Sequence, residues 1–282
     1  MGVYVARDLD DAMRALAADP QADLLAGGTD LMVEINFGRR RPESVVAIDR
    51  VEELRGIERN GLVRVGAGVT YTRLLGEDTA SRAMREASRT VGSPQIRNAG
   101  TIGGNIATSS PAGDALPVLA ALDATIVVRS LRGERRVPFA EWMTGPKRNV
   151  RERDEVVVAA EWEPAGGAQT FMKVGSRNAM VIAVASLALV VDRARARVGV
   201  ALGSCGPTIM RAREAEAFAQ GIFEELGWDR PTRPSESACA AFGTHVAAAA
   251  RPIDDVRGTA AYRRHVLAVM GARALARVGV LS

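Results

Sequence analysis

The chain has 282 residues, 47% of them hydrophobic and 25% charged, and at about 150 residues per domain this suggests a two-domain globular protein. Its two cysteines, Cys205 and Cys239, are too few for an iron–sulfur cluster or a disulfide framework, and with two histidines they argue against a zinc site, so we expect a reduced, cytoplasmic protein. A net charge of +4 and 4% aromatic residues favour a mixed-charge surface over a nucleic-acid-binding one.

The first 55 residues alternate between helix and strand signals. The opening residues carry acids where a signal peptide needs cations, so we expect no signal peptide. Residues 7–19 have the apolar spacing of an amphipathic helix that Asp8 can cap. Residues 23–26 and 44–48 are typical of strands, with a helix to about residue 37 between them. The pattern predicts a small α/β unit.

From residue 56 onward the pattern predicts mostly antiparallel α+β structure. Asn60 and Gly61 between apolar residues are a strong hairpin signal, and Arg132 and Gly133 mark another turn. Residues 92–114 are expected to form a long loop, because they are rich in Gly, Ser, Thr and Asn. The other expected elements are helices at 70–75 and 80–91, a compact apolar segment at 115–122, and strands at 125–128, 155–161 and 169–174, the last two joined through the Gly166-Gly167 turn.

The C-terminal region is predicted to pair two strands and then continue as helices. The strands are expected at 181–191 and 197–202, and the longest apolar run, residues 179–191, is too short to span a membrane as a helix. Both histidines and both cysteines are expected in surface or packing roles. The expected helices cover residues 211–220, 236–250 and 259–278, with a linker-like segment at 230–234.

The first segment suited to binding chemistry is Leu24-Leu-Ala-Gly-Gly-Thr-Asp-Leu31. Glycines let backbone N–H groups approach an anion, and the start of a helix favours negative charge. The segment lacks the G-x-G-x-x-G pattern of a Rossmann fold. An ordinary strand-to-helix turn, capped by Thr29 or Asp30, is the alternative.

The second segment is the glycine-rich stretch of residues 92–114. It offers many N–H and O–H donors, suited to a diphosphate or a polyhydroxyl chain, and one carboxylate, Asp114, that can accept from a hydroxyl. A disordered surface loop is the alternative, but the regular spacing of Ile96, Ile102 and Ile106 indicates that the segment is attached to a core. Two such segments without a P-loop lysine suggest one extended ligand, such as a dinucleotide, between two subdomains.

Three motifs in these segments carry a family resemblance. They are A-G-G-T-D at residues 26–30, I-R-N-A-G-T-I-G-G-N at 96–105 and S-P-A-G-D at 110–114. Together they resemble the FAD-binding subunit of molybdenum hydroxylases, the xanthine dehydrogenase and carbon monoxide dehydrogenase family. F-M-K-V-G-S-R at 171–177, and A-L-G-S-C-G-P at 201–207 followed by Arg211, extend the resemblance along essentially the whole chain.

The resemblance implies an α+β fold with two domains. An FAD-binding domain of the vanillyl-alcohol oxidase (PCMH-like) type would comprise two subdomains, residues 1–55 and 56–170. Residues 171–282 would form a domain of antiparallel sheet and helices, similar to the C-terminal domain of the CO dehydrogenase flavoprotein.

The resemblance also implies the residues that bind FAD. Backbone N–H groups of the first segment would wrap the diphosphate, and the second segment would bind the diphosphate and ribityl chain from the other side. Asp114 would hold a hydroxyl of that chain, and Lys173 would lie near the isoalloxazine ring and stabilise the negative charge of the reduced flavin. The two segments contribute Leu25, Ala26, Gly27, Gly28, Thr29, Asp30 and Leu31, and Thr101, Ile102, Gly103, Gly104 and Asn105.

Some positions leave alternatives or depart from the wider fold. Lys173 is one of only two lysines, although an ordinary exposed strand lysine is the alternative, and Arg177 could serve as a salt-bridge partner. Thr29 stands in the loop where some relatives attach the flavin through histidine, so we expect non-covalent FAD. No aromatic residue occurs within residues 173–180 to shield the ring.

The resemblance implies electron transfer within a heteromeric enzyme. A small subunit with [2Fe–2S] clusters would reduce the FAD, and a large subunit would hold the molybdenum cofactor, in a dimer of heterotrimers. This chain contributes no proton-transfer residue in that scheme. A stand-alone flavin oxidase of the same wider fold and a non-catalytic assembly protein are the alternatives.

Overall fold

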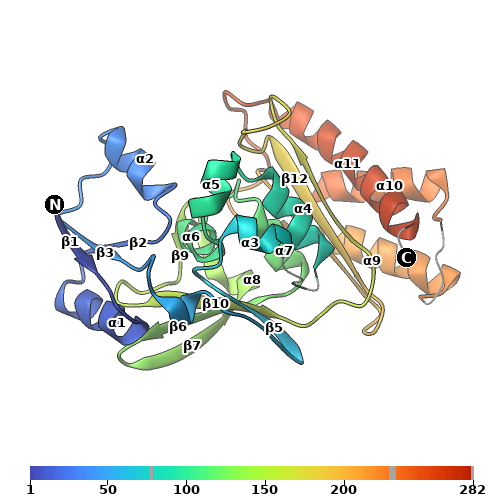
Figure 1. The fold of residues 1–282 in the computed structure, drawn as a ribbon. Coiled ribbons are helices and arrows are strands. Elements are labelled where there is room, and N and C mark those ends of the chain that lie inside the picture. The colour runs from blue at the N-terminus through green and yellow to red at the C-terminus, as the bar shows by residue number, and fades with distance from the viewer. Residues whose placement is uncertain (77–78, 80, 229–232, 281–282) are drawn as a thin grey trace.

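A computed structural model describes residues 1–76, 79, 81–228 and 233–280. Figure 1 shows a small N-terminal unit beside a central sheet and helices, with a second sheet and long helices at the opposite end. The architecture mixes α-helices with mainly antiparallel sheets, and the expected α+β class is confirmed. The linker predicted at 230–234 lies largely outside the described residues.

The N-terminal unit is a three-stranded parallel sheet with one helix on each side of it (Figure 1). Helix α1 (Leu9–Ala18) forms as predicted, and the Asp8 side chain caps it by accepting from Asp11 N. The sequence did not reveal β1, because its four residues are exposed and show no buried alternation. The other elements are β1 (Gly2–Val5), β2 (Asp23–Leu25), α2 (Leu31–Asn36) and β3 (Ser44–Ala47), in the order β1-β3-β2.

Buried Asp11 makes this unit sensitive to acid. Its carboxylate accepts from Tyr4 OH at 2.7 Å and Arg7 N at 3.0 Å, and these hydrogen bonds lower the pKa of Asp11 to about 2. An unfolded aspartate titrates near pH 3.9, so the stabilisation is complete above that pH and is lost as the pH falls toward 2. Wild type should therefore lose more free energy of unfolding than Asp11→Asn between pH 4 and pH 2, measured by urea unfolding. If the free energy of unfolding fell equally with pH in wild type and Asp11→Asn, the lowered pKa of Asp11 would be contradicted.

A five-stranded antiparallel sheet forms the centre of the molecule, in the order β4-β5-β10-β6-β7. The hairpin predicted at Asn60-Gly61 is present, with Gly61 at φ +78°, and β6 and β7 turn at Gly133 as predicted. The strands are β4 (Ile57–Asn60), β5 (Leu62–Gly66), β6 (Thr125–Ser130), β7 (Gly133–Pro138) and β10 (Val156–Trp162). A short 3-10 helix η1 (Glu52–Leu54) precedes them, and α8 (Phe139–Trp142) leads into the small hairpin β8 (Met143–Gly145) and β9 (Arg148–Asn149).

The expectation of a long loop at residues 92–114 is wrong. Ser93 caps one short helix and Thr101 caps another, each by accepting from the backbone N–H three residues later. Ile102 and Ile106 are fully buried and attach this segment to the core, as predicted, but Ile96 is 38% exposed and does not. The helices of this region are α3 (Tyr71–Gly76), α4 (Arg82–Thr90), α5 (Pro94–Ala99), α6 (Ile102–Thr108) and α7 (Ala115–Ala121).

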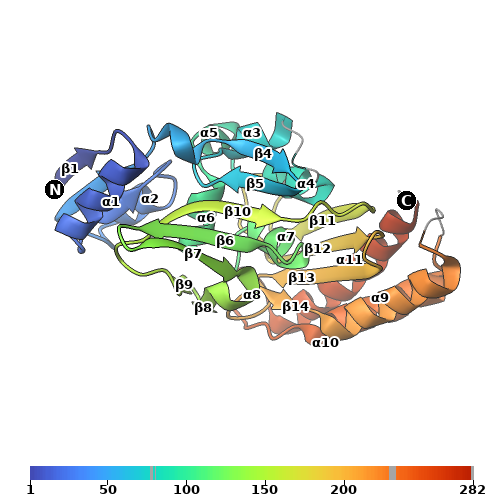
Figure 2. The same ribbon diagram turned by 90° about the horizontal axis from the view of Figure 1, so that it is seen from below.

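The C-terminal region packs a four-stranded antiparallel sheet between two layers of helices. Helices α4 and α7 lie against its inner side and three long helices cover the other, as Figure 2 shows from below. Strand β11 pairs with β12 rather than with β10, so the Gly166-Gly167 segment joins two sheets and does not close a hairpin. The elements are β11 (Gln169–Val174), β12 (Ala185–Asp192), β13 (Arg197–Gly203), β14 (Met210–Arg211), α9 (Arg213–Leu226), α10 (Glu236–Ala249) and α11 (Ala260–Val280).

The cysteines and His245 have packing roles and His265 is exposed, in line with the expected surface or packing roles. Cys205 and Cys239 are buried, and burial raises the pKa of the Cys205 thiol to about 12, which keeps it protonated. The ring of His245 lies against Phe218, with centroids 4.9 Å apart. Within the described ranges, no group of three or more His, Cys, Asp or Glu could hold a metal ion, and no helix is long and apolar enough to cross a membrane.

Candidate functional site

The first glycine segment connects β2 to α2 and leaves several backbone donors free. Gly28 has φ +71°, a conformation that favours glycine. Among the described residues, nothing accepts a hydrogen bond from the N–H groups of Gly27, Gly28, Thr29 and Asp30. Asp30 stands at the N-cap of α2 without capping it, so the alternative of a turn capped by Thr29 or Asp30 is not what the structure shows. The free N–H groups suit an anion.

The two glycine segments are in direct contact. A Cβ on Gly27 would overlap the carbonyl of Ala99, so only glycine allows this approach. A Cβ on Gly100 would lie 3.3 Å from Thr29 Oγ1. The segments are therefore neighbours in space although about 70 residues separate them in the sequence.

The second segment uses its two adjacent glycines differently. Thr101 Oγ1 accepts from Gly104 N at 3.0 Å, and Gly103 N donates to Ala67 O at 2.9 Å, which fixes the start of α6 against the central sheet. A Cβ on Gly103 would overlap Ala67. A Cβ on Gly104 would meet only Thr101 Oγ1, at 3.2 Å. Gly103 therefore permits the close packing of α6 against the central sheet, whereas Gly104 has only the Thr101 hydroxyl close to it.

A cavity of about 310 Å³ lies where α4, α5, α6 and β11 meet. It brings together three of the predicted site residues, Asn105, Asp114 and Lys173. Asn105 Oδ1 and Asp114 Oδ1 are buried and have no hydrogen-bond partner within the described part of the chain. The other lining residues are Val91, Gly92, Ser93, Ile96, Ala112, Gly113, Met180, Val181 and Ile182. The cavity thus joins a mostly apolar wall to a few polar atoms, as ligand sites do.

Lys173 and Asp114 form a buried ion pair in this cavity. Lys173 Nζ lies 2.5 Å from Asp114 Oδ2 and donates to Thr90 O at 3.1 Å. Their side chains are only 6% and 5% exposed, so the alternative of an ordinary exposed strand lysine is wrong. Burial raises the pKa of Asp114, while the charge of Lys173 and the hydrogen bonds from Lys173 and Thr90 oppose that rise. The pair holds the Lys173 ammonium group in a fixed position near the end of β11.

Sequence reasoning missed Thr90 and the segment 180–182. Thr90 contributes its carbonyl to Lys173 and its hydroxyl to Asp114 Oδ2 at 3.1 Å. The position of Thr90, two residues before the glycine-rich segment begins at Gly92, was the only feature of the sequence that could have indicated its role. Residues 180–182 lie six to eight residues beyond the end of β11 and carry no motif that marks them. Arg177 binds the carbonyls of Ala179 and Met180, within its own loop, and has no carboxylate partner among described residues.

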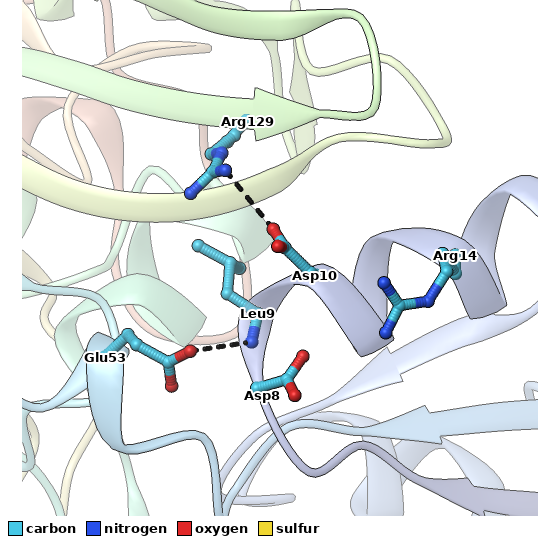
Figure 3. Close-up of a pocket in the computed structure, with 6 residues that line it drawn as sticks. All are labelled: Asp8, Leu9, Asp10, Arg14, Glu53 and Arg129. Carbon is cyan, nitrogen blue, oxygen red and sulfur yellow. Dashed lines mark hydrogen bonds and ion pairs between the residues drawn. The ribbon is translucent and has the colours of Figure 1, made fainter.

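A second pocket, of about 380 Å³, lies away from these residues (Figure 3). It is found between α1, η1 and β6, and its polar groups bind one another. Arg129 Nη2 pairs with Asp10 Oδ1 at 3.2 Å, and Leu9 N donates to Glu53 Oε1 at 3.1 Å. Because these contacts join the N-terminal unit to the central sheet, the pocket is a structural junction that holds none of the predicted site residues.

Two family models cover nearly the whole chain. Residues 1–161 match the FAD binding domain in molybdopterin dehydrogenase, and residues 170–278 match the CO dehydrogenase flavoprotein C-terminal domain. The chain belongs to the family of FAD-binding medium subunits of molybdenum hydroxylases. The resemblance seen in the motifs is confirmed.

Relatives of this medium-subunit family match along most of the chain. The xanthine dehydrogenase FAD-binding subunit of Escherichia coli is 35% identical over 228 residues, 76% of this chain and 77% of that protein. The glyceraldehyde dehydrogenase medium chain of Sulfolobus acidocaldarius is 30% identical over 283 residues, 97% and 96% of the two chains. A chain of carbon monoxide dehydrogenase from Hydrogenophaga pseudoflava superposes with a TM-score of 0.87 at 28% identity, covering 99% and 96%.

Proposed function

We propose that this chain binds FAD non-covalently between its two glycine segments and serves as the electron-transferring flavin subunit of a heteromeric molybdenum hydroxylase. The observation that carries the proposal is the direct contact of the two segments next to a cavity with a buried Lys173–Asp114 pair. When bound, FAD would take electrons from the [2Fe–2S] clusters of a partner and pass them to an external acceptor. The chain itself supplies binding and orientation.

The donors and acceptors at the site fit the parts of FAD. The free N–H groups of the first segment can donate hydrogen bonds to the diphosphate. The surface of Gly104, which has no side chain, lets the ligand approach the second segment. The unpartnered Asn105 Oδ1 and Asp114 Oδ1 can accept from hydroxyl groups of the ribityl chain. The proposed binding residues are Leu25, Ala26, Gly27, Gly28, Thr29, Asp30, Leu31, Thr101, Ile102, Gly103, Gly104, Asn105, Asp114 and Lys173.

The second segment acts mainly through side chains and shape. The N–H groups of Ile102, Gly103, Gly104 and Asn105 already donate within the protein, to Val69 O, Ala67 O, Thr101 Oγ1 and Thr101 O. They are therefore not free for a diphosphate. The Thr101 N–H, the Asn105 amide and the surface of Gly104 are the parts that a ligand can contact.

Lys173 gives the site its positive charge. Its ammonium group has three N–H donors, and two of them bind Thr90 O and Asp114 Oδ2. The third remains for a ligand in the cavity. A fixed cation of this kind stabilises negative charge that develops on a bound cofactor, because it is already oriented before the charge forms.

The proposal extends to the domains, the partners and the cellular location. We propose that residues 1–55 and 56–170 form the two FAD-binding subdomains and that residues 171–282 form the C-terminal domain. The complex would include a large molybdenum subunit and a small [2Fe–2S] subunit, arranged as a dimer of heterotrimers. The absence of a disulfide framework from the sequence supports a cytoplasmic location.

The visible spectrum of the purified protein tests this proposal. We expect a flavin spectrum whose yellow colour passes into the supernatant after acid precipitation. The complex isolated from its native host should also contain iron, labile sulfide and molybdenum. Colour retained in the pellet would contradict non-covalent binding. Flavin without any of those metals would favour a stand-alone oxidase, and failure to bind added FAD would overturn the proposal.

A further inference from the structure

The β8–β9 hairpin is attached to the C-terminal end of α6. Trp142, just before the hairpin, donates from Nε1 to Ile106 O at 3.0 Å, and Asn149 Nδ2 donates to Ala107 O at 2.8 Å. At the tip, Lys147 N donates to Ser109 O at 3.0 Å. These bonds satisfy carbonyls that the end of a helix leaves without partners. The hairpin is therefore fixed to the helix that carries the second glycine segment.

Lys147 holds an unusual backbone conformation at the hairpin tip. It follows Pro146 in a two-residue turn and has φ +55°, where glycine or asparagine is the usual residue. A non-glycine residue is strained at positive φ. A lysine at such a position points to a role for its side chain.

The Lys147 side chain reaches from the hairpin to the first glycine segment. Its Nζ lies 2.5 Å from Glu34 Oε1, on α2, and 3.9 Å from Asp30 Oδ2. The ammonium group lowers the pKa of Glu34. Thr108, at the end of α6, donates to Asp30 Oδ2 at 3.4 Å in the same place. The hairpin thus connects the end of α6 to the start of α2.

We propose that Lys147 is a positioning residue that holds the first glycine segment against the second and thereby slows the release of FAD. The inference rests on the proposed function, because it assumes that FAD binds between these segments. Lys147 does not line the cavity and so acts through Asp30 and Glu34 rather than through the ligand. Its role differs in this way from that of Lys173.

The expected effect is modest and depends on salt. Both side chains of the Lys147–Glu34 pair are partly exposed, 50% and 27%, and pairs of this kind contribute up to about 1 kcal/mol. Loss of the contact should therefore speed FAD release about two- to fivefold at low ionic strength. The difference should shrink at about 1 M salt, where exposed charges are screened.

The experiment compares FAD release from wild type, Lys147→Met and the control Arg148→Met. Arg148 is the adjacent cation of the same hairpin, is exposed and forms no ion pair with a described residue, so its loss removes the same charge without the contact. Release is followed by flavin fluorescence after dilution, at low and high salt. Lys147→Arg should retain the wild-type rate. The double variant Lys147→Met/Glu34→Gln should release FAD no faster than whichever of the two single variants releases it faster.

Lys147→Gly separates positioning from general stability. Glycine removes the backbone cost at φ +55°, so the melting temperature of this variant without FAD should equal or exceed that of wild type. FAD release should still be two- to fivefold faster. Amide hydrogen exchange in α2 should also quicken without FAD, because the helix has lost its tie to the hairpin.

The outcomes distinguish the inference from the proposed function. Wild-type protein that binds no FAD would overturn the proposed function and this inference with it. Wild type that binds FAD, with Lys147→Met and Arg148→Met releasing it at one rate, would overturn the inference alone. So would an additive effect of Lys147→Met and Glu34→Gln, because two residues that act through one contact cannot lose it twice.

Discussion

Gly104→Val should fold as wild type does and yet bind FAD roughly ten- to hundredfold more weakly. A Cβ at this position meets only Thr101 Oγ1, at 3.2 Å, so the fold can accept it with a small shift of that hydroxyl. The valine methyl groups would instead occupy the space that we assign to the ligand. Overpacking of this kind costs about 1–3 kcal/mol, and each 1.4 kcal/mol is a tenfold change in affinity. Titration with FAD, together with the melting temperature of the FAD-free protein, measures both effects.

Gly103→Val is the matched control for this prediction. A Cβ on Gly103 would overlap Ala67, so this variant should lose stability even without FAD. The two variants should thus give different results: Gly104→Val should lose affinity for FAD, and Gly103→Val should lose stability. Full flavin binding by Gly104→Val would show that the segment is wrongly assigned.

Lys173→Met should destabilise the protein by roughly 3–5 kcal/mol, because it leaves the charge of Asp114 buried without its partner. Lys173 and Asp114 are 6% and 5% exposed, and little solvent reaches either side chain. The loss should appear as a lower midpoint of urea unfolding. Lys147→Met, which removes the half-exposed lysine, should change the stability far less.

The double variant Lys173→Met/Asp114→Leu distinguishes stability from function. Replacing both members of a buried ion pair by apolar residues often restores stability, so the double variant should unfold near the wild-type midpoint. It should still bind FAD weakly, because the Lys173 ammonium and the Asp114 carboxylate are both gone from the site. Wild-type affinity for FAD in the double variant would place this ion pair away from the ligand.

Several elements of the fold could be predicted because their causes are local. The Asn60-Gly61 turn requires positive φ at glycine and joins two strands regardless of what surrounds it. Asp8 caps α1 through a donor three residues away. The pairing of β12 with β13 follows from two apolar runs and the short turn between them.

Other elements depend on contacts between distant residues. Helices α5 and α6 contain small and polar residues that favour loops, but Ser93 and Thr101 cap them and the burial of Ile102 and Ile106 stabilises them. Strand β1 has four exposed residues and exists because its backbone pairs with β3. Strand β11 has an ordinary strand pattern, and only the tertiary structure decides that it leaves the central sheet.

The residues of the candidate site also divide into those that the sequence could predict and those that only the tertiary structure brings together. The glycine motifs were visible in the sequence because close backbone approach demands glycine at Gly27 and Gly103. The bond between Lys173 and Asp114 was not visible, since 59 residues separate them and α4 must bring Thr90 to both. The role of Lys147 depends on the hairpin position, which no local pattern specifies.

The chain has only two lysines, and they differ in exposure, which has a practical consequence. Lys147 is half exposed beside the first glycine segment, whereas the Lys173 ammonium is enclosed in its ion pair. Amine-directed reagents therefore meet one accessible lysine side chain besides the terminal amino group. A fluorophore or cross-linker placed there would lie at the junction of the two glycine segments. The chain thus offers a chemical handle at this junction without engineered cysteines.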